Sequence, residues 1–123
     1  MMSLSDKRRK RIAEAKTFRR YLVESVGRCE RCEPQGKRSN KPLCVHEIAN
    51  GPNRQKALDK PFAVLVLCWQ CNSLATSKGE WSEASQLRCL LESRPEDFDL
   101  VAYNALINER APNRITMDEV QEA

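Results

Sequence analysis

Apolar residues in the first part of the chain follow a helical spacing. They recur every three or four positions between residues 5 and 26, at Ile12, Ala15, Phe18, Leu22 and Val26. This spacing places them on one face of a helix. Ser5 can cap the first turn, and Gly27 is a favourable stop. We therefore predict a helix over residues 5–26.

Two shorter segments have the patterns of β-strands. Residues 43–48 alternate, with Leu43, Val45 and Glu47 on one side and Cys44, His46 and Ile48 on the other. Residues 62–67 form a continuous, β-prone apolar run, which is typical of a buried strand. The polar stretches 33–42 and 49–61 contain Pro, Gly and Asn and are predicted to be loops.

The last third of the chain has helical patterns separated by proline. A Ser-x-x-Glu capping box at residues 77–80 predicts a helix to about residue 93. Pro95, followed by two acids, predicts the start of a second helix to about residue 112. A Thr-x-x-Glu pattern at residues 116–119 predicts a short third one. The residues expected to pack in the core are Trp69, Trp81, Leu87, Leu90, Phe98, Val101 and Leu106.

Length and composition indicate one globular domain. The chain has 123 residues, of which 31% are charged and 41% apolar, with six cysteines and only four glycines. No run of about 18 apolar residues is present to span a membrane, and the charged N-terminus does not resemble a secretory signal. We therefore expect a cytoplasmic protein, where disulfides are rare and cysteines are thiols or metal ligands.

Charge is distributed unevenly along the chain. Residues 1–60 contain 16 Lys or Arg against 7 Asp or Glu, whereas residues 61–123 contain 5 against 10. Residues 7–11 are all basic, and their mutual repulsion weakens a helix unless a polyanion neutralises it. We expect the basic half to bind DNA through its phosphates, although a solvated helix face has the same composition. The acidic half is expected to pack on the rest of the chain or to contact a protein partner.

Two Cys-x-x-Cys pairs give the strongest chemical signal. Cys29 and Cys32 form the first pair, and Cys68 and Cys71 form the second, with 35 residues between the pairs. The spacing lets both sulfurs of a pair bind one ion, and two pairs complete the tetrahedral shell of structural Zn²⁺. Buried thiols and an iron site are the alternatives. The surrounding pattern is not that of a thioredoxin-like redox protein.

Two cysteines stand outside these pairs. Cys89 falls on the apolar side of a predicted helix and is expected to be a small core residue. Cys44 is two residues from His46, so a mixed Cys/His ligand set is an alternative to the four-cysteine set. The four-cysteine set is the simpler of the two.

The cysteines and the histidine occur in a recognisable order. Cys29-x-x-Cys32 is followed by Val45-His46-Glu47-Ile48 and then by Leu67-Cys68-x-x-Cys71-Asn72. Over about residues 27–76 this order resembles the HNH endonuclease family. The resemblance implies a β-hairpin and a helix that hold one catalytic divalent metal, braced by two zinc knuckles. Here the first knuckle is the pair of Cys29 and Cys32, and the second knuckle is the pair of Cys68 and Cys71.

The expected fold class is therefore α+β. The resemblance implies a small zinc-stapled ββα-metal module, similar to a treble clef, over residues 27–76. A basic helix over residues 1–26 precedes the module. A helical extension over residues 77–123 is expected to pack on it, so that the three parts form a single domain.

The resemblance also assigns roles to single residues. In the family, the first strand ends in a pair whose first member binds the catalytic metal and whose second is commonly a histidine base. His46 falls on the first position and Glu47 on the second. Asn72 falls on the last metal position, which follows the second knuckle. These three residues are the expected catalytic site.

The sequence departs from the family pattern at two positions. The middle asparagine of the family is absent, since Ala63 stands at its place, and Asn50 or Asn53 would have to replace it. The base position holds Glu47 rather than a histidine. Three interpretations follow: Glu47 is the base, or His46 is the base and Glu47 a metal ligand, or the site is degenerate.

These residue types also suit phosphodiester hydrolysis on chemical grounds. The reaction needs a base for water and a cation for the charge on the phosphate. His46 is the only histidine and titrates near neutrality, while oxygens of Glu47 and Asn72 suit Mg²⁺ or Mn²⁺. Arg54 could hold a phosphate through two hydrogen bonds. Each residue also has a purely structural interpretation: His46 as a hydrogen-bonded histidine, Glu47 as an exposed acid, Asn72 as a helix cap and Arg54 as a surface charge.

The sequence thus predicts a metal-dependent DNA endonuclease or nickase of HNH type, with structural Zn²⁺ and catalytic Mg²⁺ or Mn²⁺. The alternative is a non-catalytic zinc module that binds nucleic acid or a protein and has a degenerate site. The set of His46, Glu47 and Asn72 discriminates between the two, because a module that only binds has no need of it.

Overall fold

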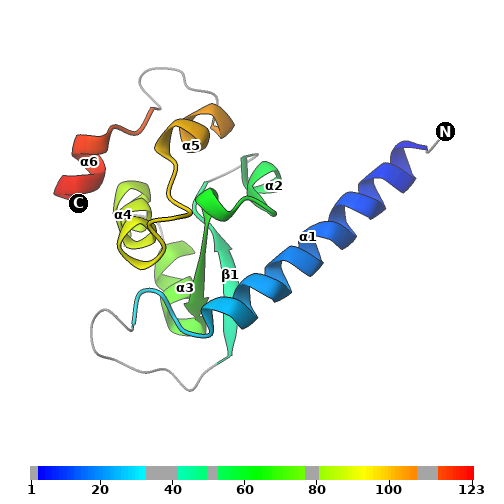
Figure 1. Ribbon diagram of the computed structural model, residues 1–123, viewed down its shortest axis with the longest axis horizontal. Helices are drawn as coiled ribbons and strands as arrows, with labels where there is room; N and C mark the ends of the chain where they lie inside the picture. Colours follow the sequence, from blue (N-terminus) through cyan, green and yellow to red (C-terminus); the bar gives the residue numbers. More distant parts are fainter. Residues whose placement is uncertain (1–2, 33–41, 50–52, 77–80, 108–113) are drawn as a thin grey trace.

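Six α-helices and two strands make up the part of the chain that the structure describes (Figure 1). In this computed structural model the described residues are 3–32, 42–49, 53–76, 81–107 and 114–123. The elements follow in the order α1 (Leu4–Val26), β1 (Leu43–Glu47), α2 (Asn53–Ala57), a 3₁₀ turn (Pro61–Ala63), β2 (Val64–Cys68), α3 (Trp69–Thr76), α4 (Glu83–Ser93), α5 (Leu100–Leu106) and α6 (Met117–Glu122). This mixture of helices with a small sheet confirms the α+β class.

The two strands form an antiparallel pair at the centre of the fold. Their register pairs Leu43 with Cys68 at one end and Glu47 with Val64 at the other. One face of the pair packs against α1. The other face lies in the larger core, to which α3, α4, α5 and α6 all contribute. All five residues of β2 are buried, which explains why the segment is apolar without alternation.

Both predicted strands are present, with shifted ends. The segment predicted over residues 43–48 forms β1 and ends one residue early, at Glu47. The apolar run predicted over residues 62–67 begins in the 3₁₀ turn and forms β2 from Val64 onwards. β2 continues to Cys68, so the strand itself ends in the first cysteine of the second knuckle.

The ends of α1 are fixed by its caps. Ser3, rather than Ser5, is the N-cap, and its hydroxyl accepts a hydrogen bond from the Asp6 N–H at 3.1 Å. Gly27 ends the helix as predicted. It adopts φ 64°, a left-handed conformation that favours glycine, and its N–H donates to the carbonyl of Val23. This turn directs the chain into the first knuckle.

Only the second half of α1 packs on the sheet. Its buried residues are Ala15 and Leu22, whereas residues 3–14 are exposed and the N-terminal end of α1 projects beyond the rest of the fold (Figure 1). A helix of 23 residues spans about 35 Å, but a five-residue strand spans about 17 Å. The sheet therefore ends before it reaches Ile12, which is exposed although it follows the helical spacing. Within the described ranges, no helix combines the length and apolar character needed to cross a membrane.

α4 begins later than predicted. Its N-cap is Ser82, whose hydroxyl accepts from the Ser85 N–H, and the capping box predicted at residues 77–80 lies outside the described residues. Leu87 and Leu90 are buried, as predicted. The helix contacts β2 and α6, so the C-terminal segment packs directly on the central strand.

α5 differs from the prediction in its start and in its buried face. It begins after Asp99, whose carboxylate caps the Ala102 N–H, and not at Pro95. Val101, expected in the core, is 75% exposed. The core-facing positions are instead Leu100, Tyr103, Asn104 and Ile107. Asn104 is buried because its amide group pairs with the backbone N–H and C=O of Ile115.

α6 and α2 are both short helices. α6 follows the predicted capping box, in which Thr116 and Glu119 hydrogen-bond reciprocally, and it buries Val120. α2 lies within residues 49–61, which were predicted to be a loop, and this prediction is wrong for part of the segment. Ala57 is completely buried in the core. This packing stabilises a helix whose sequence lacks a clear helical spacing of apolar residues.

Candidate functional site

Four cysteine side chains converge on one point of the fold. The sulfur atoms of Cys29, Cys32, Cys68 and Cys71 all lie within 4.8 Å of one another. Cys32 Sγ is 3.7 Å from Cys68 Sγ and 3.4 Å from Cys71 Sγ. A tetrahedral ion with metal–sulfur bonds of about 2.3 Å separates its sulfurs by about 3.8 Å. The predicted cysteine cluster is thus confirmed, and its sulfurs are close enough to bind a metal ion.

Local structure places each pair of sulfurs. In the first knuckle the Cys32 N–H donates to Cys29 Sγ at 3.4 Å, which curls the chain around the sulfur. In the second, Cys68 ends β2 and Cys71 lies in the first turn of α3. Trp69, the first residue of α3, lies between the two cysteines in the sequence but is directed outward. It is 64% exposed, and the expectation that it belongs to the core is wrong.

The four thiols lie close together and are largely shielded from solvent. Burial raises the pKa of the Cys32 thiol, and the neighbouring cysteine sulfurs raise it further. Burial also raises the pKa of Cys71, while the nearby Arg31 acts in the opposite direction. Arg31 Nη1 lies 3.7 Å from Cys71 Sγ, and its guanidinium group stacks over the Trp81 ring at 5.2 Å. A cation among the sulfurs would offset this unfavourable ionisation.

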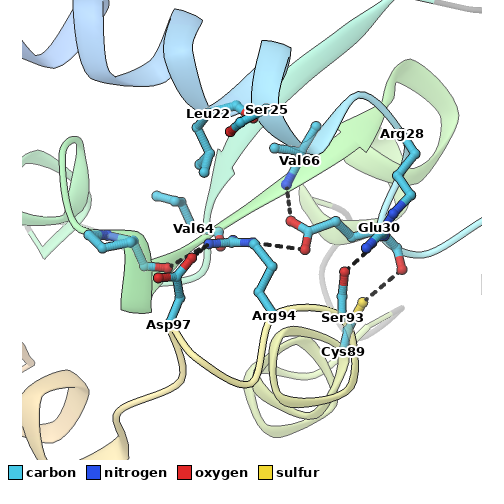
Figure 2. Close-up of polar contacts among 11 residues, drawn as sticks. Leu22, Ser25, Arg28, Glu30, Val64, Val66, Cys89, Ser93, Arg94 and Asp97 are labelled. Atoms are coloured by element: carbon cyan, nitrogen blue, oxygen red, sulfur yellow. Dashed lines mark hydrogen bonds and ion pairs between the residues drawn. The ribbon is translucent and has the colours of Figure 1, made fainter.

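The first knuckle is attached to β2 by a buried glutamate (Figure 2). Glu30, between the two cysteines of the pair, is fully buried. Its backbone N–H donates to the Val66 carbonyl at 2.9 Å, and its carboxylate accepts from the Val66 N–H at 2.8 Å. Glu30 therefore occupies the edge of β2 that β1 leaves open, which protects an edge strand from pairing with another chain.

Arg94 provides the counter-charge for this glutamate (Figure 2). Its Nε donates to Glu30 Oε2 at 2.9 Å, and its Nη1 donates to Asp97 Oδ2 at 2.7 Å. Nη2 also donates to the Val64 carbonyl at 2.6 Å. The pair thus joins the first knuckle, the edge of β2 and the end of α4. No local pattern in the sequence indicates this pair, because residues 30 and 94 meet only in the folded chain.

Replacement of Arg94 by Met should destabilise the protein by about 3–5 kcal/mol, because it leaves the buried Glu30 carboxylate without a counter-charge. The measurement is denaturant unfolding of the metal-loaded protein. Arg88→Met is the matched control. Arg88 pairs with Glu92 on α4 and donates to the carbonyls of Gln121 and Ala123, and exposed ion pairs contribute less than about 1 kcal/mol. Equal losses for the two variants would contradict a special role for Arg94.

The two remaining cysteines lie near the cluster but outside it. Cys44, on β1, donates through Sγ to the Leu67 carbonyl at 3.5 Å. Cys89, on α4, donates to the Glu30 carbonyl at 3.5 Å, and burial raises the pKa of its thiol to about 12. Both are therefore hydrogen-bonded thiols, and Cys89 helps to hold the first knuckle.

His46 lies on the face of β1 that packs against α3 and α4. Its side chain is largely buried, and its Nε2 lies 2.8 Å from Oε1 of Gln86. Burial lowers the pKa of His46 below its ordinary value, while hydrogen bonds to Gln86 and Asn72 and the charge of Glu47 act in the opposite direction. The structure thus brings His46 and Asn72 together and adds Gln86, which the sequence did not indicate.

Glu47 lies on the opposite face of β1, because successive residues of a strand alternate. Its carboxylate is 3.4 Å from Nη2 of Arg19, on α1, and 4.0 Å from Nη2 of Arg54, on α2. Arg19 also donates to the Val45 carbonyl at 2.7 Å. The Glu47 side chain is largely buried, whereas that of Arg54 is 59% exposed. Glu47 and Arg54 are therefore neighbours, and Arg19 is a third member that the sequence did not indicate.

Three residues correspond to the middle asparagine of the HNH pattern or were expected to replace it. Ala63 is buried at the end of the 3₁₀ turn, and its side chain carries no polar atom. Asn53 is the first residue of α2. Asn50 lies outside the described residues.

Comparisons of this chain with protein-family models, with curated proteins and with solved structures find no match. Conclusions about function therefore depend on the geometry of the site.

Proposed function

We propose that this chain is a metal-dependent DNA endonuclease or nickase of HNH type, braced by structural zinc. The observation that carries the proposal is the arrangement at the end of β1. His46 lies beside Asn72 on the face toward α3. Glu47 lies on the other face with two arginines. A module that only needs its four cysteines would have no use for this arrangement.

The proposed structural ion is Zn²⁺, held by the four cysteines. Four sulfur ligands that leave no open position are the donor set of structural zinc sites. The observed sulfur separations of 3.4 and 3.7 Å fit an ion at their centre. The ion would keep the buried thiols ionised, and it would join the first knuckle to β2 and α3.

In the proposed catalytic site, His46 and Asn72 hold Mg²⁺ or Mn²⁺. An imidazole nitrogen and an amide oxygen are suitable ligands for Mn²⁺, and the amide oxygen also suits Mg²⁺. The two side chains come to one place from different elements, β1 and α3. The ion would supply positive charge against the phosphate and the leaving oxygen.

Glu47 is the proposed general base. It takes a proton from water while the water oxygen bonds to phosphorus, and the bond from phosphorus to the leaving sugar oxygen breaks. That oxygen then takes a proton from solvent. Arg19 holds the Glu47 carboxylate from the side of α1. Arg54 is more exposed and its contact with Glu47 is longer, so it is suited to pair with a phosphate oxygen.

The proposed DNA contact is the exposed first half of α1. Residues 7–11 are all basic and all exposed. Arg11 donates through Nη2 to the Gln55 carbonyl at 2.8 Å, so this part of α1 lies beside α2, which carries Arg54. A DNA backbone that follows α1 would therefore reach Arg54 and Glu47.

Changing Arg8, Arg9 and Arg11 together to Gln should flatten the salt dependence of DNA binding. Each phosphate contact contributes about 0.9 to the slope of log K against log salt concentration, so three lost contacts reduce the slope by up to about 2.7. The measurement is fluorescence anisotropy with duplex DNA over a salt series. Arg114→Gln, an exposed arginine in the acidic half, is the control. An unchanged slope in the triple variant would place the DNA surface elsewhere.

The experiment that tests the proposed function is plasmid cleavage by zinc-loaded protein. We expect nicked or linear plasmid with Mg²⁺ or Mn²⁺ and none with EDTA, since the catalytic ion is then removed. A protein that binds DNA but cuts none with either ion would support the alternative, a zinc-containing nucleic-acid-binding module. The departures from the family at Glu47 and Ala63 favour that alternative.

A further inference from the structure

Gln86 joins α4 to the histidine of β1. Gln86 is buried, with a relative exposure of 4% for the residue. Its Nε2 donates to the carbonyl of Trp81 at 2.9 Å, and its Oε1 lies 2.8 Å from Nε2 of His46. Both ends of the amide thus have a partner, which a buried amide requires.

These two contacts determine where the proton of His46 lies. A backbone carbonyl only accepts hydrogen bonds, so the end of the amide at Trp81 must be the NH₂ group. The end at His46 is then the oxygen, which also only accepts. Nε2 of His46 must therefore be the donor and carry the proton. In the neutral ring, Nδ1 is left with a lone pair.

We propose that Gln86 is a positioning residue that holds His46 in the Nε2–H tautomer and so presents Nδ1 as the atom that binds a divalent ion together with Asn72. The metal-binding part of this inference rests on the proposed function, whereas the tautomer does not. In metal sites the second ring nitrogen of a ligating histidine commonly donates to an oxygen, which orients the ring. Gln86 Oε1 supplies such an oxygen here.

The inference gives the C-terminal segment a second role. The sequence indicated that residues 77–123 pack on the module, but Gln86 brings α4 to the candidate site itself. α4 is fixed in place at its other end, where Arg94 pairs with Glu30 of the first knuckle. The orientation of His46 therefore depends on an element outside the segment that resembles the HNH family.

The tautomer can be measured directly because His46 is the only histidine in the chain. Zinc-loaded protein labelled with ¹⁵N-histidine gives one imidazole in a long-range ¹H–¹⁵N spectrum, without assignment. The spectrum is recorded at pH 8, where the lowered pKa of His46 leaves the ring neutral. We expect Nε2 protonated and Nδ1 unprotonated in the wild type. The reverse tautomer would overturn the inference.

Gln86→Met removes the acceptor and keeps an unbranched side chain of similar length. It should release the tautomer into a mixture of both forms. Gln86→Glu loses the donor to Trp81 but keeps an acceptor for His46, so it should retain the Nε2–H form. Gln121→Met, at an exposed glutamine of α6, is the matched control and should resemble the wild type. A wild-type spectrum for Gln86→Met would overturn the inference.

Mn²⁺ binding tests the second part. The free-Mn²⁺ signal in electron paramagnetic resonance gives the Kd of each zinc-loaded variant. Gln86→Met should weaken binding by about 10–100-fold, as is typical when an outer partner of a ligating histidine is lost, while Gln86→Glu and Gln121→Met should stay within about threefold of the wild type. Equal Kd values for wild type and Gln86→Met would overturn the metal-positioning role.

The outcomes separate this inference from the proposed function. If the wild type binds no Mn²⁺ and cuts no DNA, the proposed function and the metal-positioning role both fail, while the tautomer assignment stands or falls on the spectrum alone. If the wild type cuts DNA but its His46 carries the proton on Nδ1, the proposed function is supported and the inference fails. If Gln86→Met does not fold, the Gln86→Glu spectrum decides, because loss of the Nε2–H form there overturns the inference.

Discussion

Cys68→Ser should leave the chain unfolded or aggregated. Cys68 is fully buried at the junction of β2 and α3, and its loss removes one of four ligands from the ion that the cysteines are proposed to hold. Structural zinc contributes about 10–16 kcal/mol in small domains, which exceeds or equals the whole stability of a typical domain. Circular dichroism and metal analysis are the measurements, and the wild type should contain about one equivalent of zinc. A strong chelator should have the same effect as the substitution.

Cys44→Ser is the control for this prediction. Cys44 lies on the neighbouring strand and only donates to the Leu67 carbonyl, a hydrogen bond that a serine hydroxyl can also make. This variant should keep its zinc and most of its stability. A Cys68→Ser protein that is well folded without metal would show that the cluster is not the structural centre of the fold.

His46→Ala should abolish DNA cleavage while the zinc content stays the same. The four cysteines do not include His46, so the structural ion is retained. Loss of a general base typically reduces a rate by about 10²–10⁴, and loss of a metal ligand is expected to cost at least as much. The unpaired Gln86 amide should reduce stability by about 1–3 kcal/mol, which an unfolding measurement would register separately. Cleavage at the wild-type rate would show that His46 takes no part in catalysis.

Glu47→Gln distinguishes the roles left open for the pair. If Glu47 is the base, the rate should fall and extra Mg²⁺ or Mn²⁺ should not restore it. If Glu47 is a metal ligand, a higher metal concentration should recover part of the rate. Its position between Arg19 and Arg54, on the face of β1 opposite to His46, leads us to expect the first result. Plasmid cleavage over a metal titration is the measurement.

The parts of the site that the sequence revealed are those with a local pattern. The spacing within each knuckle identified Cys29, Cys32, Cys68 and Cys71, because two residues are enough to bring both sulfurs to one ion. The alternation around His46 identified β1 for a similar reason. His46 and Asn72 were brought together only by resemblance to a family, since 25 residues separate them in the chain.

The parts that the sequence did not reveal depend on contacts between distant segments. Gln86, Glu30 and Arg94 have ordinary neighbours in the sequence, and their importance comes from burial against β1 and β2. Val101 is exposed, and not in the core as expected, for a related reason. Its helix buries the polar Asn104, whose amide group binds the Ile115 backbone, and no count of apolar spacing includes such a residue.

The Glu30–Arg94 pair joins segments that a ribosome produces at different times. Cys29 and Glu30 are made early, β2 and the second knuckle follow, and Arg94 comes last. Until Arg94 is present, closing the first knuckle would bury the Glu30 carboxylate without a counter-charge, at a cost of several kcal/mol. The nascent chain should therefore keep its first thiols accessible until α4 has been synthesised, and the four-cysteine cluster should close late, together with the C-terminal helices.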